Sequence, residues 1–445
     1  MQVVPTENLP AFADLGLAPS LVKALSRAGI ESPFPIQAAT IPDVLAGRDL
    51  LGRAATGSGK TLAFGLPMIV RLEGRPSTPR RPRGLILVPT RELAMQVTDA
   101  IAPLADARGV SVRLVAGGLP IGKQINSLER GVDVLVATPG RLIDLIERRS
   151  CSLEEVEVTV LDEADHMADL GFLPVVRRLL DMTPSGGQRL LFSATLDGDV
   201  GVLVDKYLKN PAAHALHSAV ASVDSMSHHL FRLDHAAKFE VISEIAARPG
   251  RSILFVRTKY GADRLARQLG AVGVAAGALH GGRSQSQRTR ALTAFKDGSV
   301  PVLVATDVAA RGIHVDDVSL VLHVDPPQDG KDYLHRSGRT ARAGESGTVV
   351  LLTTSAEERA VRKMLGEAGV RPDQRDVAPG DQAVASITGA RRPSGTAIVV
   401  RPSPAAQPGR RSSAAGGNRP TSSPRRRHQV DGGRGGSSPR GRSGH

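Results

Sequence analysis

The chain has 445 residues, a formal net charge of +13 and one cysteine, Cys151. This length exceeds what a single hydrophobic core usually serves, so two domains of roughly 150 to 200 residues each are expected. One cysteine excludes an internal disulfide framework and suits a reducing compartment, and we expect a small side chain that is either buried or at the surface. The sequence has no run of about 18 apolar residues and no leader pattern, which predicts a soluble cytoplasmic protein without membrane association.

The positive charge is concentrated at the C-terminal end. Residues 391–445 contain twelve Arg, no Lys and one acid, Asp431, so they carry +11 of the +13 and leave +2 for residues 1–390. Pro, Gly, Ser and Arg dominate this end, and no aromatic residue follows Tyr333. Such a composition cannot build a core, so we expect residues 370–445 to form a disordered, low-complexity tail. The tail is either a flexible RNA tether or merely solvated.

Residues 1–210 alternate short apolar runs with longer segments of helical character, as is typical of an α/β domain with a parallel sheet. A polar or glycine-containing cluster follows each run at once. Ligands of open α/β sheets bind at the carboxyl ends of the strands, so we expect the chemistry at that edge. The runs are Leu50-Leu51, Leu85-Ile86-Leu87-Val88, Val134-Leu135-Val136-Ala137, Val158-Thr159-Val160-Leu161 and Leu190-Leu191-Phe192.

A second series of apolar runs follows an irregular stretch at residues 211–227, which we interpret as a linker. These runs predict a second α/β domain over residues 228–369. They are Ile253-Leu254-Phe255-Val256, Val302-Leu303-Val304-Ala305, Leu320-Val321-Leu322 and Val349-Val350-Leu351-Leu352.

A glycine-rich loop follows the first predicted strand. Residues 54–61 have the sequence Ala-Ala-Thr-Gly-Ser-Gly-Lys-Thr and precede a helical segment. The glycines let backbone N–H groups close around phosphate, Lys60 reaches the outer phosphates and the Thr61 hydroxyl binds Mg²⁺. The pattern predicts a nucleotide site, although Ala54 stands where the general phosphate loop has Gly.

An acidic tetrad, Asp162-Glu163-Ala164-Asp165, follows another predicted strand, which places its first two carboxylates at the edge beside this loop. One carboxylate is suited to hold Mg²⁺ through water while its neighbour orients and deprotonates the attacking water. An isolated acidic run is as often the solvated start of a helix. Its pairing with the glycine loop favours the catalytic interpretation.

Three arginines, Arg336, Arg339 and Arg342, lie close together in a segment expected to be well structured. Arginine is suited to stabilise transition-state charge on a transferring phosphoryl group. A solvated basic helix is the alternative for an isolated segment of this kind.

Ten motifs in order, over roughly residues 10–370, resemble the complete set of the DEAD-box ATP-dependent RNA helicases, and the chain looks most like the bacterial RhlE-type members. The resemblance implies two tandem RecA-like domains with parallel sheets, ATP and Mg²⁺ as cofactors, and RNA as the partner. The motifs are Gln37, the glycine loop, 89–94, Gly117-Gly118, 138–141, 162–165, Ser193-Ala194-Thr195, Leu279-His280-Gly281, 304–312 and 335–339.

The resemblance also implies roles at the ATP site. Phe12 would stack on adenine and Gln37 would hydrogen-bond its edge. Asp162 and Thr61 would hold Mg²⁺ largely through water, and Glu163 would act as the base toward water. The implied catalytic residues are Lys60, Asp162, Glu163, Arg339 and Arg342, the last two as arginine fingers from the second domain. The implied nucleotide-binding residues are Phe12, Gln37, Ala54, Ala55, Thr56, Gly57, Ser58, Gly59, Lys60, Thr61, Asp162 and His314.

Two further groups of residues would link ATP to RNA. Phosphate contacts bind any sequence, so sequence-independent RNA binding is implied. ATP would close the two domains on one bent strand, and hydrolysis with phosphate release would reopen them. The implied coupling residues are Asp165, Ser193, Thr195 and His335. The implied RNA-binding residues are Pro89, Arg91, Gly118, Thr138, Gly140, Arg141, Arg288 and Thr306.

The sequence departs from the family pattern most clearly at His314, where the family generally has Asp contacting the ATP ribose. An imidazole still hydrogen-bonds a ribose but brings no fixed negative charge, so ATP affinity or its pH dependence is expected to differ. Phe34 stands where Thr is usual. Ala55 and Ala341 replace the commoner Gln and Gly, which are changes of small expected effect.

Three functions are compatible with these residues. The first is an RNA helicase that unwinds short duplexes or remodels RNA–protein complexes. The second is an ATP-gated RNA clamp or annealing chaperone, and the third is a DNA-directed motor. We expect a monomer, with ribosomal or RNA-degradation proteins as further partners.

Overall fold

The structure is a computed structural model that describes residues 2–3 (backbone only), 9–54, 57–196, 198–215, 226–310, 315, 317–341 and 346–398. Every described residue belongs to one compact unit within residues 1–403. The predicted tail beyond residue 398 therefore lies outside the described residues. Within the described ranges, no helix has the length and apolar character needed to span a membrane.

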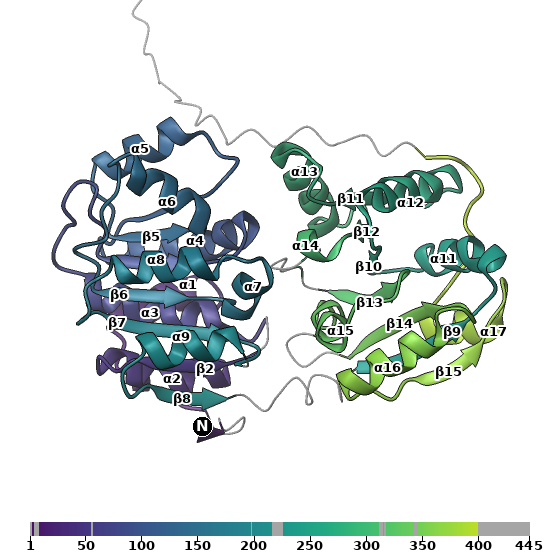
Figure 1. The fold of residues 1–445 in the computed structure, drawn as a ribbon, viewed down its shortest axis with the longest axis horizontal. Helices are drawn as coiled ribbons and strands as arrows, with labels where there is room; N and C mark the ends of the chain where they lie inside the picture. The colour runs from purple at the N-terminus through teal and green to yellow at the C-terminus, as the bar shows by residue number, and fades with distance from the viewer. Residues whose placement is uncertain are drawn as a thin grey trace, which may run out of the picture. The chain divides into compact units, whose positions relative to one another are not determined.

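The first half of the chain is built on a parallel sheet (Figure 1). In the described part of the chain this sheet has eight strands, in the order β1-β8-β2-β7-β6-β3-β5-β4. All neighbouring strands run parallel. The strands are β1 (Gln2–Val3), β2 (Leu50–Arg53), β3 (Gly84–Leu87), β4 (Val112–Val115), β5 (Val134–Ala137), β6 (Val158–Leu161), β7 (Gln188–Ser193) and β8 (Ala212–Ala215).

Helices cover both faces of this sheet because successive strand side chains point to opposite sides. In β3, Ile86 faces one buried cluster, whereas Leu85 and Leu87 face the other. The first cluster is covered by η1 (Phe12–Leu15), α1 (Pro19–Arg27), α2 (Pro35–Leu45), α3 (Lys60–Leu72) and α4 (Arg91–Asp106). The second is covered by α5 (Ile121–Glu129), α6 (Pro139–Glu147), α7 (Ala164–Asp169), α8 (Leu173–Asp181) and α9 (Asp199–Tyr207).

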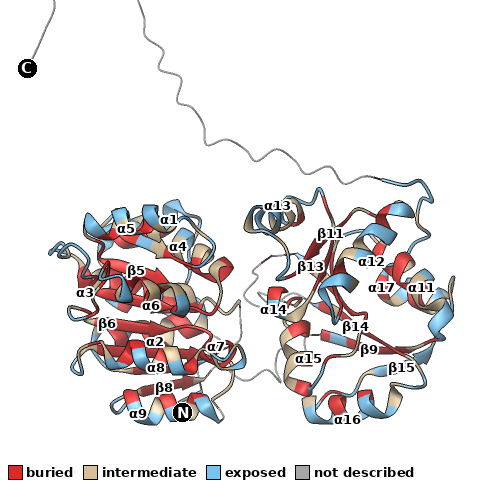
Figure 2. Ribbon diagram, turned by 45° about the horizontal axis from the view of Figure 1, so that its top comes forward, coloured by how far each residue is buried: buried red, intermediate tan, exposed pale blue. Residues whose placement is uncertain are grey.

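The second half of the chain repeats this design. Its described strands form a seven-stranded parallel sheet in the order β11-β12-β10-β13-β14-β9-β15. Figure 2 shows the strands of both sheets as largely buried. The strands are β9 (Met226–Arg232), β10 (Arg251–Phe255), β11 (Ala276–Leu279), β12 (Val302–Ala305), β13 (Val318–His323), β14 (Gly347–Thr353) and β15 (Asp373–Asp376).

Helices again lie on both faces of the second sheet. One buried cluster packs against α11 (Lys238–Ala246), α12 (Lys259–Ala271) and α17 (Gln382–Thr388), with η2 (His235–Ala237) preceding α11. The other packs against α13 (Gln285–Lys296), α14 (Asp307–Ala310), α15 (Gly330–Ser337) and α16 (Glu358–Ala368). The predicted α/β fold with parallel sheets is confirmed, and all nine predicted apolar runs lie on strands or directly at strand ends.

Two predicted boundaries were wrong. The linker predicted at 211–227 includes β8, which pairs with β2, so the first sheet extends to Ala215. The folded part also continues past Gly369, because β15 pairs with β9 and α17 buries Val384 at 1% exposure. Residues 370–398 are therefore not part of a disordered tail. The four residues of β15 are all polar and exposed, so no apolar pattern marked them as a strand.

The strand order explains why one edge gathers the motifs. Strands β2, β7, β6, β3 and β5 are contiguous in the first sheet and parallel. Their carboxyl ends precede the glycine loop and the clusters beginning at Ser193, Asp162, Pro89 and Thr138. These five segments therefore lie along the same edge, as predicted.

Cys151 is 4% exposed and packs in the cluster under α5 to α9. Burial raises the pKa of its thiol to about 12. A thiol this basic is protonated at neutral pH.

Candidate functional site

The glycine loop runs from the end of β2 to the start of α3. The backbone N–H of Ala54 donates to the carbonyl of Ser193 (3.1 Å), which ties the loop to the end of β7. Gly57 and Gly59 adopt φ values of +91° and +85°, which glycine adopts without strain. Thr61 lies in the first turn of α3, and Ala55 and Thr56 lie outside the described residues.

Lys60 occupies the interior of this loop. Its Nζ donates to the Ala54 carbonyl (3.1 Å) and lies 3.8 Å from Oδ1 of Asp162. The two side chains are only 6% and 3% exposed. A buried lysine held between a loop carbonyl and a carboxylate is positioned to bind an anion that enters the loop.

Gln37 holds the loop from the other side. Its Oε1 accepts the Phe34 backbone N–H (2.9 Å) and its Nε2 donates to the Gly59 carbonyl (2.9 Å). Gln37 is 1% exposed, and Phe12 is 2% exposed within the core. Gln37 thus bonds within the protein, and Phe12 packs in its core. Their contacts with adenine stay predictions.

The carboxylate pair Asp162 and Glu163 lies at the end of β6, and both residues are buried. Burial raises the pKa of Asp162 to about 6 against the opposing charge of Lys60, and the Glu163 carboxylate adds to the rise. Burial alone would also raise the pKa of Glu163. The hydrogen bond from His166 and the charges of Lys60 and Arg339 instead hold it below its usual value. Glu163 is therefore ionised at neutral pH.

Glu163 has an unusual backbone. Its φ of +52° places a residue with a side chain in the left-handed region, at the N-terminal cap of α7. His166 lies one turn along α7, with Nδ1 3.3 Å from Oε2 of Glu163. Strained conformations of this kind cluster at functional sites. The turn and the imidazole together fix where the carboxylate points.

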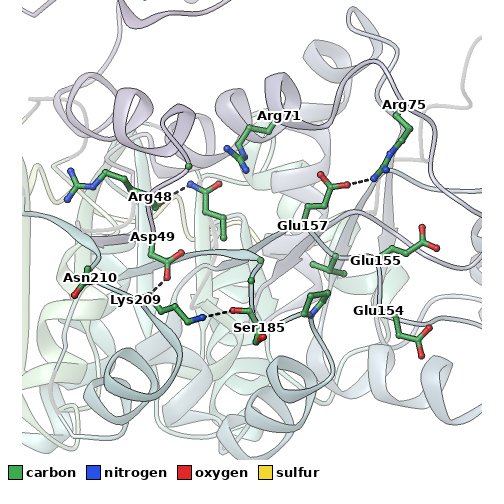
Figure 3. Close-up of a pocket in the computed structure, with 16 residues that line it drawn as sticks. Arg48, Asp49, Arg71, Arg75, Glu154, Glu155, Glu157, Ser185, Lys209 and Asn210 are labelled. Carbon is green, nitrogen blue, oxygen red and sulfur yellow. Dashed lines mark hydrogen bonds and ion pairs between the residues drawn. The ribbon is translucent and has the colours of Figure 1, made fainter.

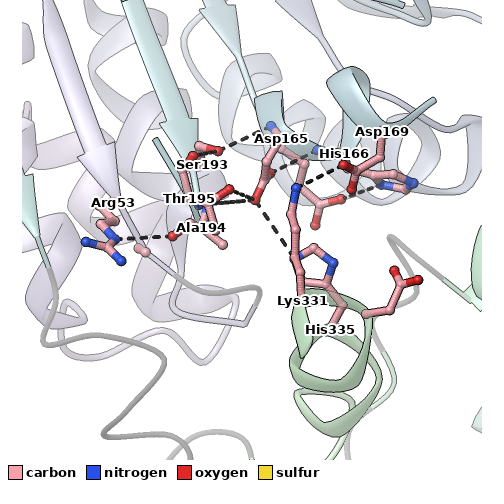
Figure 4. A network of polar contacts seen from close by, with 12 residues as sticks. Arg53, Asp165, His166, Asp169, Ser193, Ala194, Thr195, Lys331 and His335 are labelled. Atoms are coloured by element: carbon pink, nitrogen blue, oxygen red, sulfur yellow. Dashed lines mark hydrogen bonds and ion pairs between the residues drawn. The ribbon is translucent and has the colours of Figure 1, made fainter. Parts of the chain in front are cut away.

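Asp165 joins this tetrad to the end of β7 (Figure 4). Its Oδ2 accepts the backbone N–H groups of Ala194 and Thr195 (both 3.2 Å), and its own N–H donates to Oγ of Ser193 (3.2 Å). The Ser193 hydroxyl donates onward to the Thr195 carbonyl (2.6 Å). The structure thus brings together three of the four predicted coupling residues in one network.

Helix α15 of the second domain supplies the fourth coupling residue. Nε2 of His335 lies 4.0 Å from Oδ2 of Asp165, and Lys331 Nζ lies 2.9 Å from Oδ1 of Asp169, also drawn in Figure 4. Arg339 donates from Nε to the His335 carbonyl (3.2 Å). Arg342 and His314 lie outside the described residues.

The predicted RNA contacts of the first domain surround one loop at residues 117–119. Arg91 Nη1 donates to the Gly117 carbonyl (2.9 Å), and Arg141 Nη1 donates to the Leu119 carbonyl (3.1 Å). Oγ1 of Thr138 accepts the Gly117 N–H (3.4 Å). Gly118 has φ +74°, Pro89 follows β3, and Gly140 lies in the first turn of α6.

The two predicted RNA contacts of the second domain are placed differently. Arg288 lies 3.1 Å from Oε2 of Glu92, and Gln285 donates to Oε1 of the same carboxylate (2.9 Å). Glu92 belongs to α4, so this pair joins the two halves of the chain. Thr306 follows β12 and donates its N–H to the Leu279 carbonyl (3.2 Å).

Sequence reasoning missed several residues at this edge. His166 was overlooked because one histidine on a short helix carries no pattern. The Lys331–Asp169 pair joins positions far apart in the chain, so no spacing indicated it. Arg336 was noted only as one of three neighbouring arginines. It makes a bidentate pair with Asp307 (2.5 and 2.8 Å) and is 3% exposed, which fixes α14 against α15.

A hollow of about 880 Å³ lies at the opposite edge of the first sheet, near the amino ends of β2, β6 and β7 (Figure 3). Its charged groups pair largely with the protein: Asp49 accepts backbone N–H groups, and Arg75 pairs with Glu157 (2.5 Å). None of the predicted site residues lines it. The carboxyl edge is therefore the better candidate for chemistry.

The geometry at the carboxyl edge defines a class of protein. A glycine loop leading into a helix, a buried lysine and a strand-end carboxylate pair are the parts of a nucleoside triphosphatase of the phosphate-loop type. The second sheet domain places His335 4.0 Å from Asp165, and the charge of Arg339 acts on Glu163.

Comparisons with known proteins agree with this class. The family model "DEAD/DEAH box helicase" matches residues 34–201, and "Helicase conserved C-terminal domain" matches residues 237–344. The DEAD-box ATP-dependent RNA helicase CshA of Bacillus subtilis is 38% identical over 353 residues, covering 79% of this chain and 71% of that protein. This chain belongs to the DEAD-box family of ATP-dependent RNA helicases.

Other relatives are longer than this chain. The mitochondrial DEAD-box ATP-dependent RNA helicase 9 of Arabidopsis thaliana is 42% identical over 369 residues, which is 81% of this chain and 60% of that protein. The chain thus spans about three fifths of the length of such plant relatives. Among solved structures, S. cerevisiae Dbp5 bound to RNA and ADP BeF3 matches with a TM-score of 0.76 at 29% identity, covering 85% of this chain and 99% of that one.

Proposed function

We propose that this chain is an RNA-stimulated ATPase that binds RNA without sequence specificity and unwinds short duplexes or remodels RNA–protein complexes. The observation that carries the proposal is the network in which Asp165 contacts both the end of β7 and His335 of the second domain. A change at the ATP site therefore has a physical route to the relative position of the domains.

ATP is the substrate of the proposed reaction. Backbone N–H groups of the glycine loop and the ammonium of Lys60 would bind its phosphates. The ionised carboxylate of Glu163, aimed by its turn and by His166, would orient the attacking water and accept its proton. Arg339 would stabilise charge on the transferring phosphoryl group, and Arg342 shares this predicted role. Phe12, Gln37, the remaining loop residues and His314 are proposed to contact the nucleotide.

The donor groups fit Mg²⁺. Asp162 is a buried carboxylate whose pKa burial raises to about 6, so a divalent cation would stabilise its charged form more fully than Lys60 does. In the described residues no cluster of three or more His, Cys, Asp or Glu side chains could hold a metal ion alone. Mg²⁺ is usually held by one or two carboxylates, waters and substrate phosphates, and Asp162 with Thr61 suits that arrangement. The ion would neutralise charge on the phosphates.

RNA would bind along the carboxyl edges of both sheets. Helix starts and backbone amides at residues 117–119 and 138–141, with Arg91, suit sugar–phosphate contacts. Dbp5, a structural neighbour, is described as bound to RNA and ADP BeF3, which supports a shared site for the strand. The pairing of Glu92 with Gln285 and Arg288 supports closure of the two domains around that strand.

ATPase assays with and without RNA test the proposal. We expect ATP hydrolysis to rise on adding single-stranded RNA, and Glu163→Gln to lower the stimulated rate by about 10² to 10⁴, the usual contribution of a positioned acid–base group. A strand-release assay on a short duplex separates unwinding from clamping or annealing. Equal stimulation by DNA would favour a DNA-directed motor, and a rate unchanged in Glu163→Gln would contradict the proposed site.

Finer features belong to the same proposal. We propose a cytoplasmic monomer of the bacterial branch, similar to RhlE-type members, that also contacts ribosomal or RNA-degradation proteins. The relatives include the CshA helicase of Bacillus subtilis, a mitochondrial helicase of Arabidopsis thaliana and a chloroplastic helicase of Zea mays. Crosslinking the protein to RNA in cells and sequencing what is bound would identify its targets.

A further inference from the structure

One aromatic side chain is far more exposed than the rest. The chain has nine Phe, three Tyr and no Trp. All twelve lie in described residues, and Tyr260 is 75% exposed, followed by Phe34 at 45%. The other two tyrosines are 5% and 0% exposed. A single exposed ring is ordinary on a protein surface, so its neighbours decide what it does.

Tyr260 lies at the binding edge of the second sheet. It is the second residue of α12, which follows the carboxyl end of β10, and the Thr258 hydroxyl caps this helix by accepting the Gly261 N–H (3.0 Å). Strand β12 pairs with β10 and ends at Ala305, directly before Thr306, one of the proposed RNA contacts. Tyr260 and Thr306 therefore follow adjacent parallel strands at one edge.

The N-terminal part of α12 is also tied to the loop that leads into α13, the helix of Arg288. Asp263 accepts a hydrogen bond from Arg283 Nε (3.1 Å) and lies 3.0 Å from His280 Nε2. A Cβ placed on Gly282 would lie 3.4 Å from Cδ of Lys259, so the lysine stem rests on this loop. Tyr260 is thus held beside a second element of the proposed RNA surface.

The surroundings of the ring are cationic. Arg257, Lys259 and Arg264 are exposed, and in the described part of the chain their side chains have no carboxylate within ion-pair distance. Lys259 Nζ lies 5.2 Å from the centre of the Tyr260 ring, over one face. Among the described residues near this segment, Asp263 pairs with Arg283 and Asp325 pairs with Lys238 (3.5 Å). An exposed ring among unpaired cations is the arrangement that single-stranded nucleic acids use, with bases stacked and phosphates paired.

We propose that Tyr260 stacks on a base of the bound single-stranded RNA, on the ring face opposite Lys259, while Arg257 and Lys259 contact the adjacent phosphates. The inference rests on the proposed RNA function and adds a base contact to a site whose other proposed contacts are with the sugar–phosphate backbone. Every base has a π face, so the contact tolerates any sequence. Its role is to hold one nucleotide against the second domain.

The test uses the full chain with Tyr260→Ala, Tyr260→Phe and, as a matched control, Val202→Ala, which alters another exposed apolar residue (49%) on α9. Single-stranded RNA oligonucleotides carry 2-aminopurine at successive positions, and binding is followed by anisotropy with a non-hydrolysable ATP analogue present. Thermal unfolding checks that each variant folds.

We expect Tyr260→Ala to weaken RNA binding about tenfold, the effect of losing one stacked base. The RNA concentration for half-maximal ATPase should rise equally, with kcat unchanged. Tyr260→Phe and Val202→Ala should stay within about twofold of the original protein. Quenching at one 2-aminopurine position should vanish in Tyr260→Ala and persist in Tyr260→Phe.

Two results would overturn the inference. Equal RNA affinity and quenching in Tyr260→Ala would show that no base stacks there, and the exposed ring would then fit a protein partner instead. Equal weakening in Tyr260→Phe and Tyr260→Ala would assign the contact to the hydroxyl. Failure of the original protein to respond to RNA would instead contradict the proposed function, so the two failures are distinguishable.

Discussion

Gly59 shows how one backbone position shapes the nucleotide loop. A Cβ there would lie 2.5 Å from Nε2 of Gln37 and 2.6 Å from Cδ2 of Phe34, at a φ of +85°. Gly74 has the same φ of +85° with nothing within 4 Å of an added Cβ. Both glycines therefore have a positive φ, but only at Gly59 would an added Cβ meet neighbouring side chains.

We predict that Gly59→Ala weakens ATP binding at least about tenfold, because the methyl group must displace Gln37 and reshape the loop. Gly74→Ala carries the same backbone strain of roughly 1–2 kcal/mol and should leave ATP binding unchanged. Titration with a fluorescent ATP analogue measures both. Equal ATP affinities for the two variants would show that contact at Gly59 does not matter.

Asp133 is a buried structural carboxylate away from the site. It accepts hydrogen bonds from the N–H and hydroxyl of Ser77 (2.9 and 2.7 Å) and of Ser111 (both 2.8 Å). Burial alone would raise the pKa of Asp133, but these hydrogen bonds hold it below its usual value. A lowered folded pKa stabilises the fold above the unfolded pKa of about 3.9, and the stabilisation is lost as pH falls through the folded value.

We predict that Asp133→Asn lowers the free energy of unfolding by about 1–3 kcal/mol at pH 7, because the amide NH2 would face the donors that one carboxylate oxygen now accepts. The loss should shrink as pH falls below about 4, because the carboxyl becomes protonated first in the unfolded chain and then, at lower pH, in the folded protein. Urea unfolding over a pH series measures this. Asp99→Asn, an exposed position on α4, is the control and should change little. A loss independent of pH would contradict the electrostatic explanation.

At the residue scale, the sequence predicted the glycine loop, Lys60 and the carboxylates because each belongs to a short contiguous motif. It did not predict that both polar atoms of Gln37 bond within the protein, or that His166 contacts Glu163. These contacts depend on how the loop and α7 are placed, and short-range spacing does not encode that placement.

At the scale of elements, Lys331 of α15 and Asp169 of α7 form a contact across the two domains. Their atoms lie 2.9 Å apart and the side chains are 37% and 25% exposed. A pair this exposed contributes about 0.2–1 kcal/mol. The pair lies on the same two helices as His335 and Asp165, so we expect its loss to weaken the proposed closure of the two domains.

We predict that Lys331→Ala lowers RNA-stimulated kcat/KM for ATP about two- to fivefold, because the closed arrangement loses this contact. Lys363→Ala, on the exposed face of α16 (82% exposed), is the matched control and should not change kcat/KM. The charge reversal Lys331→Asp with Asp169→Lys should restore activity toward the original level. No recovery in the double variant would argue against a direct pair.

Element prediction succeeded where strands are apolar on both faces, as in β3, β5 and β12. It failed for β8, whose Ala and His residues lack β-branched character, and for β15, which is wholly polar. Those strands are held by backbone hydrogen bonds to neighbours distant in sequence. Composition alone does not reveal such pairing.

At the scale of the whole molecule, the charge distribution separates the folded part from the end of the chain. Residues 391–398 belong to the folded part, since the N–H groups of Arg391, Gly395 and Ile398 donate to carbonyls of Glu244, Val272 and Gly270 (2.9–3.0 Å). Ten of the twelve arginines counted from residue 391 onward lie beyond Ile398. A deletion that tests the tail should therefore start at residue 399.

We predict that removing residues 399–445 weakens single-stranded RNA binding at low salt and flattens its salt dependence. The slope of log affinity against log salt should fall by roughly 0.7 for each phosphate that the tail contacts. Binding over a salt series measures the slope, and the ATPase rate at saturating RNA should stay unchanged. An identical slope after deletion would show that the tail is merely solvated.

The pairing of β15 with β9 has a consequence for how the protein can be shortened. A chain cut after Gly369, where the apolar pattern ends, would lose β15 and the packing of Val377 and Val384. The part of β9 that pairs with β15, residues 229–232, would then leave backbone N–H and C=O groups unsatisfied along an open edge. Copies of the shortened protein would be prone to pair strand to strand, so the polar residues of β15 protect the fold against self-association.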